Sequence, residues 1–328
     1  MSGSYCKSSA VGVIGAPHWK GQPRSGTELA PKYMREAGLI EELRKKGHTV
    51  NDYGDITFVD SVSGKDEHTS SNSVTIKNTR SVGQANKQIC DKVAKITGRG
   101  EICLTLGGDH SIAIGTIIGH AQTNPDLFVV WVDAHGDINT PLTTFSGNLH
   151  GMPVSFVLKE LSPYMPEVPG LEWCKPCLSV TNLVYVGLRD VDPLERVILD
   201  KLNIVCYSMH EVDKFGMAEI MKRIVEASGS KPIHVSFDVD GMDPSFTPST
   251  GTAVPGGLTL RDVSYLAEEI AATGRLAAID VAEVNPMLGT DEECKKTIAT
   301  TIEVLRKFLG DKRKGNAIIV HDIPRPSE

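Results

Sequence analysis

The sequence predicts an α/β fold in which helices flank both faces of one central, mostly parallel β-sheet. Short, continuously apolar runs alternate along the chain with longer amphipathic stretches, as in repeated strand–helix–strand units. The runs lack alternating polar residues, which is typical of strands that are covered on both faces. No internal repeat or linker divides the 328 residues, so we expect a single domain that spans residues 1–328.

About eight strands are expected in this sheet. They are residues 11–14, 49–53, 102–106, 127–132, 183–186, 204–207, 233–237 and 276–281. Helical patterns lie between them, at residues 31–46, 85–96, 112–121, 217–227, 260–272 and 292–309. Pro31 suits the first turn of a helix and Gly47 suits a helix end. Strands that alternate with helices are joined by right-handed crossovers, so we expect these strands to form one largely parallel sheet.

Three segments are expected to lie outside these elements. Residues 61–73 are polar and weakly patterned, which predicts a surface loop. Residues 1–10 are expected to be a disordered N-terminus, and residues 310–328 a C-terminal tail.

Composition narrows the class of protein. The net charge of −7 and the absence of a basic stripe exclude nucleic acid and anionic membranes as partners. No apolar stretch is long enough to span a bilayer, and the N-terminus lacks a secretory signal. Seven cysteines, an odd number, indicate reduced thiols. We therefore expect a cytoplasmic protein, and we interpret Cys174-Lys-Pro-Cys177 as loop sequence, with a zinc or redox motif as the alternative.

Metal-binding residue types follow the predicted strand at 127–132. In Asp133-Ala-His135-Gly-Asp137, residues two apart project from the same side of an extended chain and can converge on one point. Ligands of open parallel sheets collect at the carboxyl ends of strands. The segment therefore predicts part of a metal site, and a polar loop after a strand is the alternative.

Two further predicted strands end in the same residue types. The strand at 233–237 is followed by Asp238-Val-Asp240-Gly, and the strand at 102–106 by Gly-Gly-Asp109-His110. Each has an ordinary interpretation, because Asp-Gly is a turn sequence, Asp109 can cap a helix and a lone His110 is often structural. The ordinary interpretations would have to hold independently at all three strand ends, whereas one shared metal site explains the Asp and His residues at each of them.

The charges at these strand ends require cations. The carboxylates of Asp133, Asp137, Asp238 and Asp240 would meet there, and like charges at short range either raise pKa values or need compensation. Two divalent cations supply four positive charges, and two ions roughly 3.5–4 Å apart form a hydrolytic unit. Oxygen-rich ligation with two imidazoles favours Mn(II) or Fe(II) over thiolate zinc.

Four motifs carry a family resemblance. The chain resembles the ureohydrolase superfamily, and within it the type I arginases, in Gly107-Gly-Asp-His110-Ser, Asp133-Ala-His-Gly-Asp137-Ile-Asn139, Ser146-Gly-Asn148-Leu-His150-Gly and Ser236-Phe-Asp238-Val-Asp240-Gly-Met-Asp243-Pro. The resemblance covers nearly the whole chain and implies the arginase/deacetylase-like form of the α/β fold. It also implies two Mn(II) ions per subunit, one held by His110, Asp133, Asp137 and Asp238, the other by His135, Asp133, Asp238 and Asp240. Asp133 and Asp238 would bridge the two ions.

The resemblance implies hydrolysis of L-arginine to L-ornithine and urea by a metal-bridging hydroxide that attacks the guanidinium carbon. It implies that Asp137 orients this nucleophile and that His150 acts as a proton shuttle. Glu283 can hold the guanidinium through a bidentate, charge-assisted contact, and Thr252 adds a contact. A surface histidine and a solvated acid at a strand exit are the ordinary alternatives for His150 and Glu283.

Recognition of the α-amino acid end separates arginine from other guanidino substrates. The resemblance assigns the substrate carboxylate to Asn139, Thr144 and Ser146, and the α-ammonium to Asp192 directly. Asn148, Gly151 and Glu195 would assist through water. Asp192 and Glu195 can equally be the N-cap and acidic first turn of a helix. Agmatine or guanidinobutyrate as the substrate, and a non-catalytic oligomeric scaffold, remain the alternative functions.

Two further expectations depend on the resemblance. Gly136 stands where the family commonly has Ala or Thr, and its backbone freedom predicts weaker metal binding. The family is commonly homotrimeric, and Arg261-Asp262 and the segment around Arg313 lie where such enzymes have intersubunit contacts. Solvated helix surface is the alternative for these charged residues.

Overall fold

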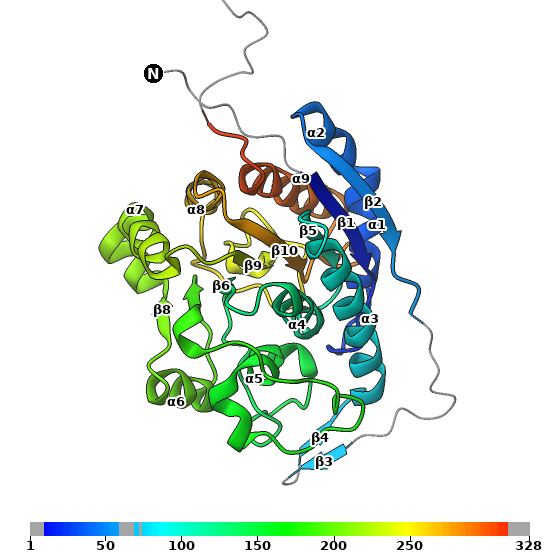
Figure 1. The fold of residues 1–328 in the computed structure, drawn as a ribbon, viewed down its shortest axis with the longest axis vertical. Coiled ribbons are helices and arrows are strands. Elements are labelled where there is room, and N and C mark those ends of the chain that lie inside the picture. Colours follow the sequence, from blue (N-terminus) through cyan, green and yellow to red (C-terminus); the bar gives the residue numbers. More distant parts are fainter. Residues whose placement is uncertain (1–9, 59–68, 72–73, 314–328) are drawn as a thin grey trace, which may run out of the picture.

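An eight-stranded sheet forms the centre of the molecule (Figure 1). The computed structural model describes residues 10–58, 69–71 and 74–313. The sheet order is β2-β1-β5-β10-β9-β6-β7-β8, and every pair of neighbours is parallel. Its strands are β1 (Ala10–Ala16), β2 (Thr49–Asp55), β5 (Ile102–Gly107), β6 (Phe128–Val132), β7 (Leu183–Val186), β8 (Val205–Tyr207), β9 (Ile233–Asp238) and β10 (Leu276–Ala282). All eight predicted strands, and the parallel α/β class, are confirmed.

Helices cover both faces of the sheet (Figure 1). The α-helices are α1 (Ala30–Glu36), α2 (Leu39–Lys45), α3 (Thr79–Thr97), α4 (Ala113–Thr123), α5 (Pro153–Val157), α6 (Pro193–Lys201), α7 (Met209–Ser228), α8 (Leu260–Ala272) and α9 (Asp291–Phe308). Apolar side chains of α1, α2, α7, α8 and α9 pack with the strands in one cluster, and those of α3 and α4 pack in the clusters on the opposite face. None of the described helices is both long and apolar enough to cross a membrane.

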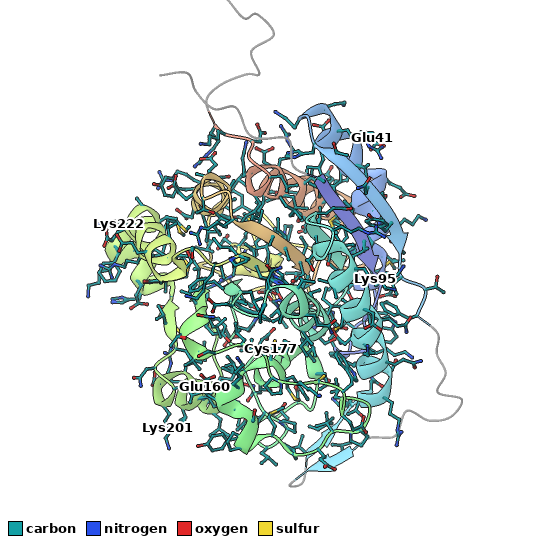
Figure 2. All side chains as sticks on the ribbon, in the orientation of Figure 1. Glu41, Lys95, Glu160, Cys177, Lys201 and Lys222 are labelled. Carbon is teal, nitrogen blue, oxygen red and sulfur yellow. The ribbon has the colours of Figure 1, made fainter. Side chains whose placement is uncertain are left out.

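Short 3-10 helices occupy several connections between these elements. They are η1 (Thr27–Leu29), η2 (His110–Ile112), η3 (Leu149–Gly151), η4 (Lys159–Tyr164), η5 (Val180–Asn182) and η6 (Val239–Gly241). Helices η2 and η6 come after strands β5 and β9, and η3 contains His150. All three therefore include residues of the motifs that the sequence singles out. Charged side chains such as those of Lys201 and Lys222 lie at the outer edge of the molecule (Figure 2).

Two predicted helices differ from the structure, one in its continuity and the other in where it begins. The helix expected at 31–46 is divided into α1 and α2, since Gly38 takes a φ of +89°, which a continuous helix does not allow. Pro31 does lie in the first turn of α1. The helix expected at 217–227 is longer, and α7 contains a non-helical kink at Gly216.

Three predictions for the remaining segments need correction or fall outside the described residues. The end of the loop expected at 61–73 includes strand β3 (Thr69–Ser71), which pairs antiparallel with β4 (Val74–Ile76), while 61–68 and 72–73 are not described. Residue 10, expected in a disordered terminus, begins β1 because it pairs with β2. The prediction for 1–9 and most of the predicted tail, 314–328, lie outside the described residues.

The parallel register brings several strand ends to the same edge of the sheet. Val132 of β6 is the partner of Phe237 in β9, and Ala282 of β10 is the partner of Asp238. Val281 of β10 is in register with Leu106 of β5. The polar residues that follow β5, β6, β9 and β10 therefore emerge side by side, where ligands of open parallel sheets bind.

Candidate active site

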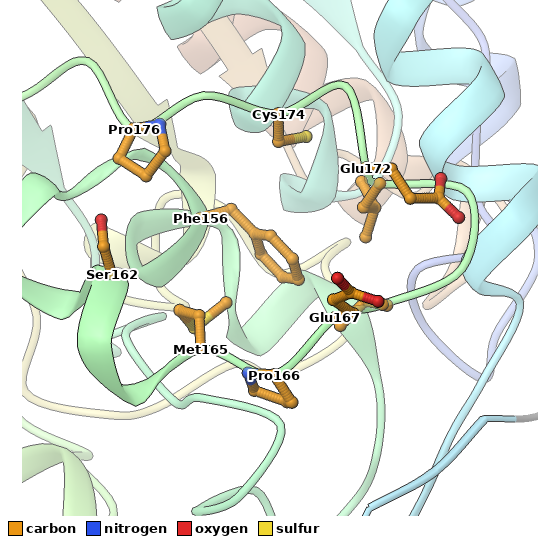
Figure 3. A pocket seen from close by; sticks show the side chains of 10 residues that line it. Phe156, Ser162, Met165, Pro166, Glu167, Glu172, Cys174 and Pro176 are labelled. Carbon is orange, nitrogen blue, oxygen red and sulfur yellow. The ribbon is translucent and has the colours of Figure 1, made fainter.

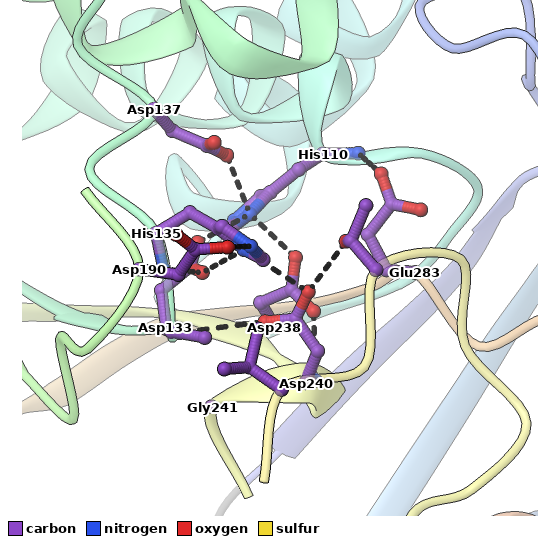
Figure 4. A network of polar contacts seen from close by, with 12 residues as sticks. His110, Asp133, His135, Asp137, Asp190, Asp238, Asp240, Gly241 and Glu283 are labelled. Atoms are coloured by element: carbon purple, nitrogen blue, oxygen red, sulfur yellow. Dashed lines mark hydrogen bonds and ion pairs between the residues drawn. The ribbon is translucent and has the colours of Figure 1, made fainter. Parts of the chain in front are cut away.

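Three carboxylates from two strand ends surround one imidazole nitrogen. His110 begins η2 directly after β5, and its Nδ1 lies 3.1 Å from Asp133 Oδ2, 3.1 Å from Asp137 Oδ2 and 3.0 Å from Asp238 Oδ2 (Figure 4). His110, Asp133 and Asp238 are at most 2% exposed. Their ligand atoms, with that of Asp137, are close enough together to hold one metal ion.

A second group of ligand atoms shares Asp133 with the first. His135 Nδ1 lies 3.4 Å from Asp133 Oδ1 and 3.2 Å from Asp240 Oδ2. The two oxygens of Asp133 therefore face different imidazoles, as expected of a carboxylate that bridges two ions. Asp238 joins only the first of these groups, so its assignment as a second bridge stays a prediction.

The hydrogen bonds around His110 fit a cation. Its Nε2 is 2.9 Å from Ser236 Oγ, and that hydroxyl donates to Asp280 Oδ2. Ser236 therefore accepts the Nε2 proton, which leaves the Nδ1 lone pair facing carboxylate oxygens. Nδ1 is buried and has no hydrogen-bond partner. A lone pair aimed at anionic oxygens is favourable only when a cation lies between them.

The pKa shifts report the same excess of negative charge. Burial alone lowers the pKa of His110, but its carboxylate neighbours outweigh burial and raise this pKa well above its ordinary value. Burial, with the nearby Asp133, raises the pKa of Asp137 to about 6. Burial opposes the effect of Glu283 on His150, yet the contact with Glu283 raises the pKa of His150 to about 9. Divalent cations would relieve this charge.

Local structure fixes the ligands of the β6 end. The indole of Trp131 donates to Asp133 Oδ2 at 2.9 Å and stacks on the His110 ring, with 4.2 Å between ring centroids. Asp137 takes a φ of +49°, uncommon for a residue with a side chain, directly after Gly136. A Cβ on Gly136 would lie 3.1 Å from the carboxyl carbon of Glu195. The effect of Gly136 on metal affinity stays a prediction, but its missing side chain makes room for Glu195.

A cavity of about 150 Å³ adjoins the ligand groups. Its lining includes eleven of the residues predicted for the site, namely His135, Asp137, Asn139, Thr144, Ser146, His150, Gly151, Asp192, Glu195, Asp238 and Thr252. Asn148 and Glu283 do not line the cavity. The structure thus brings together most of the residues predicted separately for metal and substrate.

The far side of this cavity is organised around α6. Asn139 Nδ2 donates to Asp192 Oδ2 at 2.9 Å. Glu195 accepts the backbone N–H groups of Ile138 and Asp192, each at 3.0 Å, so it links both walls. Asp192 and Glu195 also form the capping box of α6, which confirms the helix interpretation beside the predicted substrate role.

Glu283 lies between the cavity and the core, only 1% exposed. It follows β10 with a φ of +63°, and its Oε1 accepts the His110 backbone N–H at 2.8 Å. His150 Nδ1 is 3.2 Å from the same oxygen. The alternatives of a solvated acid and a surface-loop histidine are therefore wrong. Thr252 Oγ1 donates to Asp240 Oδ2 at 2.8 Å, so its observed partner is a ligand carboxylate.

Sequence reasoning missed three residues near the site. Asp190 lines the cavity, 3.7 Å from His135 Nε2, and lies two residues before Asp192. Arg189 donates to the carbonyl oxygens of Asp240 and Met242 at 2.7 and 3.1 Å. Gln22 reaches Glu283 from the loop after β1. No local pattern marks Gln22, because its contact joins distant parts of the chain.

Asp109 and the Cys174 motif have structural roles. Asp109 caps η2 by accepting from Ser111 N–H, as the N-cap interpretation predicts. Cys174 and Cys177 are free thiols, and burial raises the pKa of Cys177 to about 12. Cys174 lines a separate cavity of about 330 Å³ with Phe156 and Met165 (Figure 3). Residues 174–177 belong to no helix or strand, as the interpretation as loop sequence predicts.

Known proteins resemble this chain in sequence and in fold. A sequence model of the arginase family matches residues 9–310. The chain belongs to the arginase family. It is 52% identical to Arginase-1 of Bos taurus over 314 residues, which cover 94% of this chain and 96% of the bovine one. It is 49% identical to the mitochondrial Arginase-2 of Homo sapiens, with 97% and 90% of the two chains covered.

Solved arginase structures have the same architecture as this member of the family. The crystal structure of Entamoeba histolytica arginase in complex with L-ornithine matches with a TM-score of 0.79 at 30% identity. The match covers 93% of this chain and 100% of the other. The eight-stranded parallel sheet predicted from the sequence is therefore the arginase fold.

Proposed function

We propose that this protein hydrolyses L-arginine to L-ornithine and urea. The observation that carries the proposal is the cavity whose one wall holds metal-ligand residues, including Asp137 and Asp238, and whose other wall holds Asp192 and Asn139. A guanidinium at one end and an α-amino acid at the other match these walls. The arginase names of the relatives, at about half identity over nearly full length, support the same reaction.

The metal site is proposed to hold two Mn(II) ions. Carboxylate-rich ligation with one imidazole in each group suits Mn(II) better than thiolate-binding metals. When bound, two divalent cations would ionise a water molecule near neutral pH and so supply the nucleophile. The assigned ligands are His110, Asp133, His135, Asp137, Asp238 and Asp240.

Protein groups orient the substrate and move protons in this proposal. Glu283 neutralises the guanidinium, and Asp137 accepts a proton from the attacking water and orients it. His150 delivers a proton to the departing amine, because its raised pKa of about 9 keeps it protonated at neutral pH. The contact between His150 and Glu283 places this acid beside the guanidinium-binding carboxylate.

The α-amino acid end of the substrate is assigned to the opposite wall. Asp192 binds the α-ammonium, and Asn139, Thr144 and Ser146 bind the α-carboxylate. Asn148, Gly151 and Glu195 assist through water, and Thr252 holds Asp240. Agmatine has no α-carboxylate and its amine is not an α-ammonium, so these residues would be unneeded for it.

A urea-release assay on the manganese-loaded protein tests this function. We expect a higher kcat/KM for L-arginine than for agmatine, since only L-arginine uses both walls of the cavity. The Asp133→Ala variant should lose both bound manganese and turnover, because it removes the shared carboxylate. Faster turnover of agmatine would replace the arginase proposal by an agmatinase. Unchanged metal content in Asp133→Ala would contradict the site.

Assembly, location and domain organisation belong to the same proposal. We expect a cytoplasmic homotrimer built from one domain per chain. Arg313 contacts Glu268 of α8 at 2.9 Å, and Asp262 takes part in capping the same helix, so these two of the charged residues named for the interface have partners within one subunit. Sedimentation of the purified protein measures its oligomeric state directly.

A further inference from the structure

The loop between β1 and η1 contacts several parts of the site, although its sequence has no metal-ligand pattern. Gly21 N–H donates to Asp109 Oδ2 at 2.8 Å, and the N–H of His150 donates to Gly21 O at 3.0 Å. Further along the loop, Asn285 Nδ2 donates to Ser25 O at 3.0 Å. The loop is therefore held against the segments that follow β5 and β10.

Within this loop, Gln22 makes a buried contact with the carboxylate of Glu283. Gln22 is 3% exposed, and its Nε2 donates to Glu283 Oε2 at 2.8 Å. The other oxygen, Oε1, already faces the His110 N–H and His150 Nδ1. A carboxylate offers about four lone-pair positions, so these three contacts leave one, on Oε2.

We propose that Gln22 is a positioning residue that fixes the Glu283 carboxylate so that the free position on Oε2 faces the substrate guanidinium. The inference rests on the proposed function, in which Glu283 binds that group. Without the amide, the orientation of the Glu283 carboxylate would depend on the two contacts of Oε1 alone. The guanidinium would then meet a carboxylate whose orientation is not preset.

Two features of the backbone support this role. Glu283 has a φ of +63°, and such a conformation persists only where surrounding contacts hold it. A Cβ on Gly251 would lie 3.2 Å from Gln22 Oε1, which is closer than side chains normally approach. The glycine therefore leaves the space in which the Gln22 amide and Glu283 meet.

The test compares Gln22→Met, which keeps the length of the side chain but removes the donor, with the wild-type protein. Manganese-loaded proteins are assayed for urea release from L-arginine, and L-ornithine binding is measured by calorimetry. We expect KM for L-arginine to rise about 10-fold or more. The dissociation constant of L-ornithine, which lacks a guanidinium, should stay within about two-fold, and the manganese content should not change. A general structural defect would weaken both ligands.

Gln122→Met is the matched control, because the Gln122 amide in α4 contacts Cys90 Sγ at 3.1 Å and touches none of the site residues. It should leave both ligands unaffected. If Gln22→Met fails to fold, Gln22→Asn, whose amide is one methylene short of Glu283, should show the same selective rise in KM.

The outcomes separate this inference from the proposed function. An unchanged KM for L-arginine, or equal weakening of L-arginine and L-ornithine, overturns the role of Gln22 while leaving the arginase reaction intact. If the wild-type protein prefers agmatine, the arginase proposal fails. The role of Gln22 is then tested by comparing Gln22→Met with the wild-type protein on agmatine, which has the same guanidinium. A protein that hydrolyses neither substrate overturns both.

Discussion

Asp192 is the residue proposed to distinguish L-arginine from substrates that lack an α-amino acid group, so a single carboxylate tests the proposed specificity. Asp192→Asn keeps the shape of the side chain and a good helix N-cap but removes the charge. We expect KM for L-arginine to rise about 10- to 100-fold, as for loss of one charge-assisted hydrogen bond. The kinetic constants for agmatine should stay as in the wild-type protein.

A second Asp on the same helix provides the control for this substitution. Asp200 lies on the exposed surface of α6, where its partner is Arg196. Asp200→Asn should leave both substrates unaffected. An equal rise in KM for L-arginine and agmatine in Asp192→Asn would mean that Asp192 stabilises the whole site rather than recognising the α-ammonium.

The clustered His and Asp residues of the candidate metal site were predictable because each belongs to a short local pattern. His110, Asp133 and Asp238 follow strands that the apolar runs identify, and parallel strand ends must meet at one edge. The Gln22–Glu283 contact was not predictable in this way. It spans 261 residues and depends on how the loop after β1 folds over the sheet.

At the scale of elements, buried apolar strands and amphipathic helices were predicted well. Strand β7 and helix α8 have the predicted bounds, because apolar periodicity reports burial directly. The break at Gly38 was missed, since a pattern of apolar residues does not report the sign of φ at a glycine. The helix predicted at 217–227 begins directly after the kink at Gly216, and the part of α7 before that kink was missed. Helix α6 was expected only as the alternative interpretation of Asp192 and Glu195, and it exposes two apolar side chains, Leu194 and Val197.

Arg189 joins three elements beside the metal ligands. Its guanidinium donates to Gly187 O at the end of β7, to Asp240 O in η6 and to Val254 O in a neighbouring loop. We expect Arg189→Ala to lower the free energy of unfolding by about 2–4 kcal/mol, because several carbonyl groups lose a charged donor. Urea unfolding measures this change, and a manganese titration should show weaker binding because Asp240 is held less firmly.

Two further variants sharpen this result. Arg189→Lys should recover only part of the stability, since one ammonium cannot span the carbonyls that the planar guanidinium reaches. Arg196→Ala removes an exposed arginine of α6 and should cost less than about 1 kcal/mol. A loss in Arg189→Ala as small as that in Arg196→Ala would contradict the linking role.

For the molecule as a whole, the sequence predicts an apolar sheet but not the polar cluster buried within it. His120 of α4 is fully buried, its Nδ1 lies 3.2 Å from His234 Nδ1, and His234 contacts Asp280. These residues come from three elements whose apolar patterns gave no sign of a polar contact. Their placement depends on how α4 packs on β9 and β10, which is a property of the folded molecule.

This cluster makes the stability of the whole molecule depend on pH. Burial, with a smaller effect of His234, lowers the pKa of His120 from 6.5 to about 3. Between these two pH values the unfolded chain binds a proton that the folded protein does not, so stability falls as pH decreases below 6.5. From pH 7 to pH 5 this histidine alone should cost about 2 kcal/mol.

His120→Asn removes this titration, so its free energy of unfolding should fall less than that of the wild-type protein between pH 7 and pH 5. Urea unfolding at both pH values measures the difference, with chelator present in every sample because acid also releases metal. Carboxylates titrate in both proteins and cancel in the comparison. His210→Asn, at an exposed position of α7, is the control and should keep the wild-type pH dependence. Equal pH dependence of His120→Asn and the wild-type protein would mean that His120 is protonated in the folded state.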